Sequence, residues 1–118
     1  VPPLLQRHNL GLDEIDYWEI NEAFAVQVLA CLAAWQDEDY CRNELGLDTT
    51  LSVINPSRLN VDGGAIALGH PVGATGARLV LHLLKVLQRN NAQTGIASLC
   101  IGGGQGGAML ISRERERL

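Results

Sequence analysis

The sequence of 118 residues lacks a long apolar run, an excess of basic residues and closely spaced cysteine pairs. A membrane-spanning helix needs roughly 20 predominantly apolar residues, and the most apolar charge-free stretch, 23–35, is shorter. Nine Lys and Arg against 13 Asp and Glu give a net charge of −4, which disfavours binding to a phosphate backbone. We therefore expect no membrane and no nucleic acid as partner.

The three cysteines, Cys31, Cys41 and Cys100, lack the spacing of a disulfide framework or a zinc site, so no metal is expected. Unpaired thiols are typical of a reducing compartment, and the sequence thus predicts a cytoplasmic protein. Cys31 is expected to pack in a helix, and Cys41 lies in a charged segment where no role is assigned to it. The chain opens on Val1-Pro2-Pro3 without an initiator Met or an apolar leader, so we expect a piece of a longer polypeptide.

Apolar residues make up 47% and charged residues 19% of the chain, the balance of a folded domain rather than of a disordered chain. The predicted elements are a helix over 2–9 with Gly11 as its cap, a strand over 17–20, a helix over 23–35, a charged surface segment with a short helix over 36–50, an edge strand over 51–54, a helix from 72 to about 90, and a hairpin of strands 95–101 and 108–112. Their alternation predicts an α/β domain with a mixed sheet.

The two longer predicted helices differ in polarity. The helix over 23–35 has one polar side chain, Gln27, so we expect it to be buried between layers. The second helix has a polar stripe and an apolar stripe, and the polar stripe leaves His82 without a chemical role. The polar stripe is Arg78, His82, Lys85 and Arg89, and the residues expected to pack inward are Ala77, Val80, Leu84 and Leu87.

Ten of the 13 glycines fall within two clusters, 63–76 and 102–107. Two tight turns explain such clusters, and so does a backbone that approaches a ligand closely; composition alone favours the turns. The spacing matches neither of the two glycine-rich phosphate-binding motifs, so a nucleotide-binding module is only a weak alternative.

Three residues are candidates for chemistry, each with a structural alternative. His70 precedes Pro71, which restricts its backbone, and it serves either as an oriented imidazole or as a structural hydrogen-bonding group. Cys100 ends a predicted strand and is either a packing residue or a thiol that exchanges a proton. Asn21 lies between a strand and a helix, where it either caps the helix or holds a water or a carbonyl oxygen.

Three segments together resemble the thiolase family. They are Asn21-Glu22-Ala23-Phe24-Ala25, the run 60–76 with Gly69-His70-Pro71, and Cys100-Ile101-Gly102-Gly103-Gly104. Their order and approximate spacing are similar to those in the C-terminal domain of acetyl-CoA acetyltransferases and 3-ketoacyl-CoA thiolases. The resemblance implies that residues 1–118 form one thiolase C-terminal domain, with a mixed sheet and a buried helix layer. It would be one half of a layered αβαβα architecture whose N-terminal domain is absent.

The resemblance also implies a role for each matching residue. Asn21 corresponds to the asparagine that positions a water in a first oxyanion hole. His70 corresponds to the histidine that donates to the thioester oxygen in that hole and helps to activate a nucleophilic cysteine. Cys100 corresponds to the second catalytic cysteine, which exchanges a proton with the acetyl α-carbon or with CoA. Gly102 corresponds to the glycine whose N–H contributes to a second oxyanion hole.

The implied activity is that of a CoA-dependent acyltransferase of fatty acid and lipid metabolism. Such an enzyme cleaves 3-ketoacyl-CoA with CoA, or runs the reverse Claisen condensation, through an acyl-cysteine. Acyl-CoA is the implied partner, with coenzyme A a substrate or product rather than a covalently bound cofactor, and the parent is expected to be a homodimer or homotetramer. The family's acylated cysteine matches nothing here, so the chain alone is predicted to be inactive. The alternative is a non-catalytic module that binds acyl-CoA or a protein; Asn21, His70 and Cys100 together favour the enzyme.

Overall fold

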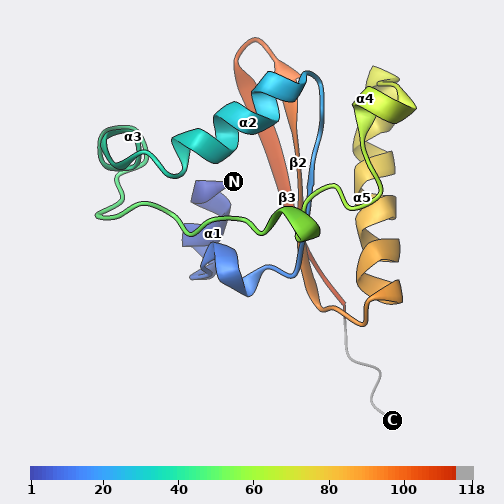
Figure 1. Cartoon of the computed structure of the whole chain (residues 1–118), viewed down its shortest axis with the longest axis horizontal. Helices are drawn as coiled ribbons and strands as arrows, with labels where there is room; N and C mark the ends of the chain where they lie inside the picture. The colour runs from blue at the N-terminus through green and yellow to red at the C-terminus, as the bar shows by residue number, and fades with distance from the viewer. Residues whose placement is uncertain (114–118) are drawn as a thin grey trace.

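The computed structural model describes residues 1–113, so residues 114–118 of the predicted domain 1–118 lie outside the described part. In chain order the elements are α1 (Pro2–His8), a 3₁₀ turn (Leu12–Glu14), β1 (Tyr17–Ile20), α2 (Ala25–Ala34), α3 (Glu38–Asn43), a second 3₁₀ turn (Pro56–Arg58), α4 (Ala65–Leu68), α5 (Val72–Arg89), β2 (Thr94–Gly102) and β3 (Gln105–Ser112). Three layers result, because α1 and α2 cover one face of the sheet and α5 covers the other (Figure 1). The predicted α/β class and the strand over 17–20 are confirmed.

The sheet is mixed, with β2 at its centre. β1 runs parallel to β2, pairing Tyr17 with Gly95 and Ile20 with Ser98. β3 returns antiparallel to β2 and forms the predicted hairpin. Since parallel strands end at the same edge, the residues that follow β1 and those at the end of β2 lie side by side.

Alternation along the strands divides the core into two clusters. Trp18, Ile20 and Ile96 point toward α1 and α2, and they pack with Leu5 and Val28 from those helices. The second cluster lies on the opposite face and joins α5 to the sheet. Its buried members are Leu79, Leu83, Leu87, Ala97 and Ile111.

Close packing of α5 on β2 requires a glycine at position 95. A β-carbon at Gly95 would lie 2.8 Å from Cδ1 and 3.0 Å from Cγ of Leu83, whose side chain is fully buried. We expect Gly95→Ala to lower the free energy of unfolding by about 1–3 kcal/mol, because overpacking forces side chains off their rotamers. Urea unfolding measures the change.

The control for this substitution lies in the first turn of α5. A β-carbon at Gly73 meets nothing within 4 Å, so Gly73→Ala is expected to raise stability by about 0.5–1 kcal/mol through helix propensity. A Gly95→Ala variant as stable as the Gly73→Ala variant would contradict the packing that the structure shows.

The inward face of α5 differs from the prediction. Leu87 is buried as expected, but Ala77 and Leu84 are exposed and Val80 is half-buried. The buried face is turned by one residue, or about 100°, and it consists of Thr75, Leu79, Leu83, Val86 and Leu87. The reason is that apolar residues cover a wide arc of α5, so periodicity alone does not select between neighbouring stripes.

α2 is also less buried than its composition predicts. Only Val28 is buried, whereas Phe24, just before the helix, and Val26 and Leu29 on it are 73%, 70% and 64% exposed. The sequence predicted covering layers on both sides of this helix, and the described residues supply one. The other apolar side faces outward.

The segment between α2 and α4 contains the remaining corrections. The predicted edge strand over 51–54 is wrong: Leu51 and Ser52 accept hydrogen bonds from the Gln36 amide, at 2.7 and 3.1 Å, and no strand forms there. The segment instead reaches β1 further on, through a bridge between Leu59 and Trp18 and through hydrogen bonds of Asn60. Cys41, expected in a surface segment, is fully buried, and its thiol donates to the Trp35 carbonyl over 3.4 Å.

α1 ends at His8, close to the predicted end, and its C-cap is Asn9, whose φ of 53° is left-handed, rather than the predicted Gly11. Within the part of the chain that the structure describes, no helix has both the length and the apolar character needed to cross a bilayer.

Candidate active site

Asn21 is placed by the end of β1. Its N–H donates to the Ser98 carbonyl over 2.9 Å, which continues the parallel ladder by one residue. Strand alternation turns its side chain toward α5, and Asn21 is only 1% exposed. It does not cap α2, because the N-cap position is Phe24 and no side chain bonds there. The amide of Asn21 is therefore available to another group.

That group is the imidazole of His70. Nδ2 of Asn21 lies 3.5 Å from Nε2 of His70, although the two residues are 49 positions apart. The ring is held on its other side by Thr75, whose Oγ1 lies 2.7 Å from Nδ1. The same hydroxyl donates its one proton to the Pro71 carbonyl over 3.1 Å, so it accepts from Nδ1–H of His70. This tautomer leaves a lone pair on Nε2, directed at the Asn21 amide.

Thr75 is a site residue that the sequence analysis missed. It is fully buried in the first turn of α5, and it orients the imidazole by accepting the Nδ1 proton. The sequence does contain a signal for Thr75. A threonine four residues after Pro71 can donate its hydroxyl proton to the Pro71 carbonyl in the first turn of a helix.

Cys100 lies on the neighbouring strand, near the carboxyl end of β2, where it is half-buried. Asn21 stands one residue past the last paired position, Ile20 with Ser98, which places it level with Leu99. Leu99 packs toward the α5 side, so alternation directs Cys100 to the opposite face of the sheet. Among the described residues no hydrogen bond joins the Cys100 thiol to Asn21 or His70.

Gly102 follows a register shift in the β2–β3 ladder. Its φ of +112° is a conformation that residues with a side chain rarely adopt. The structure thus brings Asn21 and His70 into contact, and it places Cys100 and Gly102 at the same edge of the sheet without joining them to that pair.

A charge network in which only Glu19 is buried lies beside this pair, between β1 and α5. Glu19 is 1% exposed, and burial raises its pKa to about 7, while Arg78 opposes the rise and Asp62 and Glu22 add to it. His82 bridges two carboxyl groups, with Nε2 3.5 Å from Oε1 of Glu19 and 3.0 Å from Oδ2 of Asp62.

The network continues to the end of α5. Arg89 donates to Asp62 over 2.7 Å, and this hydrogen bond lowers the pKa of the Asp62 carboxyl. The polar stripe of α5 therefore faces partly inward, and His82 has partners that the sequence analysis did not expect. Within residues 1–113, no three His, Cys, Asp or Glu side chains are grouped closely enough to hold a metal ion.

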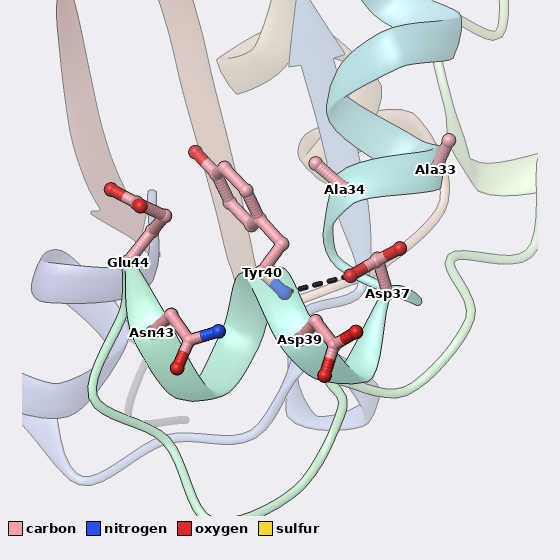
Figure 2. A pocket seen from close by; sticks show the side chains of 7 residues that line it. All are labelled: Ala33, Ala34, Asp37, Asp39, Tyr40, Asn43 and Glu44. Atoms are coloured by element: carbon pink, nitrogen blue, oxygen red, sulfur yellow. Dashed lines mark hydrogen bonds between the residues drawn. The ribbon is translucent and has the colours of Figure 1, made fainter.

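A separate hollow of about 450 Å³ lies between the end of α2 and α3 (Figure 2). Asp37, Asp39 and Glu44 give it an acidic lining, and Oδ1 of Asp37 accepts from the Tyr40 N–H over 2.7 Å as the cap of α3. α3 lies on the opposite side of the molecule from α4 and α5 (Figure 1). This hollow therefore takes no part in the arrangement around His70.

Comparison with known proteins shows what the chain is similar to. A family model described as "Thiolase, C-terminal domain" matches residues 1–113. The peroxisomal 3-ketoacyl-CoA thiolase 2 of Arabidopsis thaliana is 44% identical over 115 residues, which cover 96% of this chain and 21% of that protein. The cytosolic acetyl-CoA acetyltransferase of Mus musculus is 48% identical over 103 residues, which cover 87% and 22%. The structure of acetyl-CoA acetyltransferase from Syntrophomonas wolfei matches with a TM-score of 0.77 and 38% identity, over 96% of this chain and 26% of that one.

These relatives correct the prediction of a cytoplasmic protein. They include a peroxisomal thiolase as well as a cytosolic one, so unpaired cysteines, on which the prediction rested, do not single out one compartment. The chain spans about a fifth to a quarter of the length of the proteins named here. The family model matches nearly the whole chain, and the fold agrees with that of a solved acetyltransferase. This chain therefore belongs to the thiolase family and matches the C-terminal domain of its members.

Proposed function

We propose that this chain supplies the C-terminal half of the active site of a CoA-dependent acyltransferase. The enzyme would cleave 3-ketoacyl-CoA with CoA or run the reverse condensation of acetyl-CoA. The observation that carries the proposal is the contact between the buried Asn21 amide and the His70 imidazole, whose tautomer Thr75 fixes.

His70 has two tasks in the proposed reaction. Its Nε2 lone pair takes the proton of a nucleophilic thiol, which then attacks the thioester carbonyl. Once protonated, Nε2–H donates to the oxygen that becomes negative during this attack. Asn21 stabilises the same oxygen through its amide, directly or through a water, and such preorganised donors are worth a factor of about 10² to 10³ each.

Cys100 and Gly102 act on the second half of the reaction. In condensation, the Cys100 thiolate removes a proton from the α-carbon of acetyl-CoA, and the N–H of Gly102 stabilises the resulting enolate oxygen. The α-carbon then attacks the carbonyl of the acyl-cysteine, and the cysteine thiolate leaves. Cleavage is the reverse, with the Cys100 thiol returning the proton to the α-carbon.

The acylated cysteine is proposed to come from the rest of a longer polypeptide. The chain spans about a fifth of the thiolase from Arabidopsis thaliana, and it exposes apolar surface that another part could cover. An apolar hollow of about 650 Å³ lies between α5, β2 and β3, and Leu81 and Met109 at its lining are 61% and 53% exposed. We further propose that coenzyme A is a substrate, that the parent acts in lipid metabolism and that it is a homodimer or homotetramer.

The test compares the isolated chain with a full-length thiolase that carries it as its C-terminal part. We expect the full-length protein to convert acetoacetyl-CoA and CoA to acetyl-CoA, measured by chromatography of the CoA esters, and the isolated chain to show no turnover. Binding of acetoacetyl-CoA by the full-length protein without cleavage would favour the non-catalytic binding module. Turnover by the isolated chain would contradict the proposed division of the site.

A further inference from the structure

Hydrogen bonds at two points join the segment that carries His70 to β1 and to the residues just after it. The first is Asn60, whose side chain pairs with the backbone of Ile20 as a neighbouring strand would. Its Oδ1 accepts from the Ile20 N–H over 2.9 Å, and its Nδ2 donates to the Ile20 carbonyl over 2.8 Å. The backbone N–H of Asn60 also donates to the Trp18 carbonyl over 2.9 Å. The edge of β1 is thereby satisfied without a further strand.

The second point is Glu22, the residue next to Asn21. Its Oε1 accepts from Nδ2 of Asn60 over 3.3 Å, and its Oε2 accepts from the backbone N–H of Ile66 over 3.1 Å. Ile66 lies in α4, which ends at Leu68, two residues before His70. One carboxylate therefore ties the residue beside Asn21 to both ends of the segment that leads to His70.

Gly64 allows the carboxylate to come this close. A β-carbon at Gly64 would lie 2.6 Å from Cδ and 2.7 Å from Oε2 of Glu22. The φ of Gly64, −146°, lies outside the left-handed range, and the close approach of Glu22 gives a reason for glycine here. Gly63 differs, since its φ is +81° and an added β-carbon would meet only Ala67, at 3.9 Å.

We propose that Glu22 is a positioning residue of the active site, whose carboxylate sets the placement of the His70 imidazole against the Asn21 amide. The expected effect on catalysis rests on the proposed function. The placement of the His70 imidazole by Glu22 does not. A small misplacement of reacting groups costs up to about 100-fold in rate, so loss of this link is expected to lower kcat more than it changes KM.

The first test is a double-substitution cycle in the full-length thiolase, assayed with acetoacetyl-CoA well below the melting temperature of each variant. Glu22→Ala and Gly64→Ala are each expected to lower kcat about 10- to 100-fold, with KM changed less than about threefold. The double variant should be no slower than Glu22→Ala, because the added methyl then meets no carboxylate. Gly63→Ala is the matched control, and its effect should multiply with that of Glu22→Ala. If the effects of Gly64→Ala and Glu22→Ala on kcat also multiplied in the double variant, the inference would be overturned.

The second test needs no activity and uses the chain itself. The side-chain amide resonance of Asn21 should shift when His70 is replaced by alanine, because the two nitrogen atoms lie 3.5 Å apart. We expect this shift to shrink at least twofold in Glu22→Ala and to persist in Glu44→Ala, a substitution at an exposed glutamate. An unchanged shift in Glu22→Ala would overturn the inference. A reduced shift in Glu22→Ala, together with a full-length protein that shows no thiolase activity, would uphold the inference and refute the proposed function.

A conservative variant covers the case in which Glu22→Ala does not fold. Glu22→Gln keeps one oxygen acceptor for an N–H donor but replaces the other with an NH₂ group, which repels one of the two donors. Its kcat is expected to fall at least fivefold with KM nearly unchanged. Wild-type kcat in Glu22→Gln would overturn the proposal.

Discussion

Replacing His70 by alanine in a full-length thiolase that carries this chain is expected to lower kcat by about 10²- to 10⁴-fold. In the proposed mechanism the substitution removes both the base for the nucleophilic thiol and one donor to the developing oxyanion, and general acid–base catalysis alone contributes a factor of this size. Fold stability should change little, since His70 is only half-buried. The measurement is the rate of acetoacetyl-CoA cleavage together with the melting temperature. His8→Ala, at an exposed histidine, is the control and should keep wild-type rates.

Cys100→Ser separates the two halves of the proposed reaction. A serine hydroxyl is a far weaker base than a thiolate, so exchange of the acetyl α-protons with deuterium in solvent should fall by orders of magnitude. Acylation of the enzyme by acetyl-CoA, followed by mass spectrometry, should persist in Cys100→Ser and be lost in His70→Ala. Rates within a few-fold of wild type for both variants would move the chain to the non-catalytic binding alternative.

Between pH 4.5 and 7 the chain is expected to lose stability because of Glu19. Burial raises the pKa of Glu19 from 4.5 to about 7, so in this interval the folded state keeps a proton that the unfolded state has released. The free energy of unfolding therefore falls as the pH rises, and it levels off above pH 7. At about 1.36 kcal/mol per pKa unit, the rise from 4.5 to about 7 makes the loss on the order of 3 kcal/mol.

Glu19→Gln is expected to remove this dependence, because the amide stays neutral at every pH. The measurement is urea unfolding of both proteins at pH 5, 6, 7 and 8. Glu44→Gln, at an exposed glutamate, should retain the wild-type slope. A Glu19→Gln variant that loses stability over this range as steeply as the wild type would show that Glu19 is not the cause of the dependence.

The elements that were predicted well are those with strong local signals. The strand Tyr17–Ile20 and the helix Val72–Arg89 agree with the prediction within a residue or so, because an apolar period and flanking Asn and Pro mark them. Where an edge strand was predicted over 51–54, Leu51 and Ser52 bond to the Gln36 side chain. The polar groups of Ile20 at the edge of β1 pair with the Asn60 side chain instead of a strand. The apolar period of a sequence cannot reveal that a side chain, and not a strand, pairs with the edge of β1.

The candidate site divides in the same way. Asn21 and His70 were named from sequence segments that resemble thiolases, and the structure brings them into contact. The sequence did not lead to a role for Thr75, Glu22 or Glu19. Their importance follows from the groups that they contact in the folded structure, and those groups are mostly distant in the sequence. The roles of Cys100 and Gly102 stay predictions.

The sequence by itself determined the α/β class, the family and the order of the motifs, because spacing, glycine content and apolar period are properties of a string of residues. Only the tertiary structure decided which stripe of α5 faces inward, why Gly64 is a glycine and which tautomer His70 adopts. These features depend on contacts between distant positions, such as Glu22 with Ile66 across 44 residues. Such contacts exist only after β1 and the segment that carries His70 have packed together.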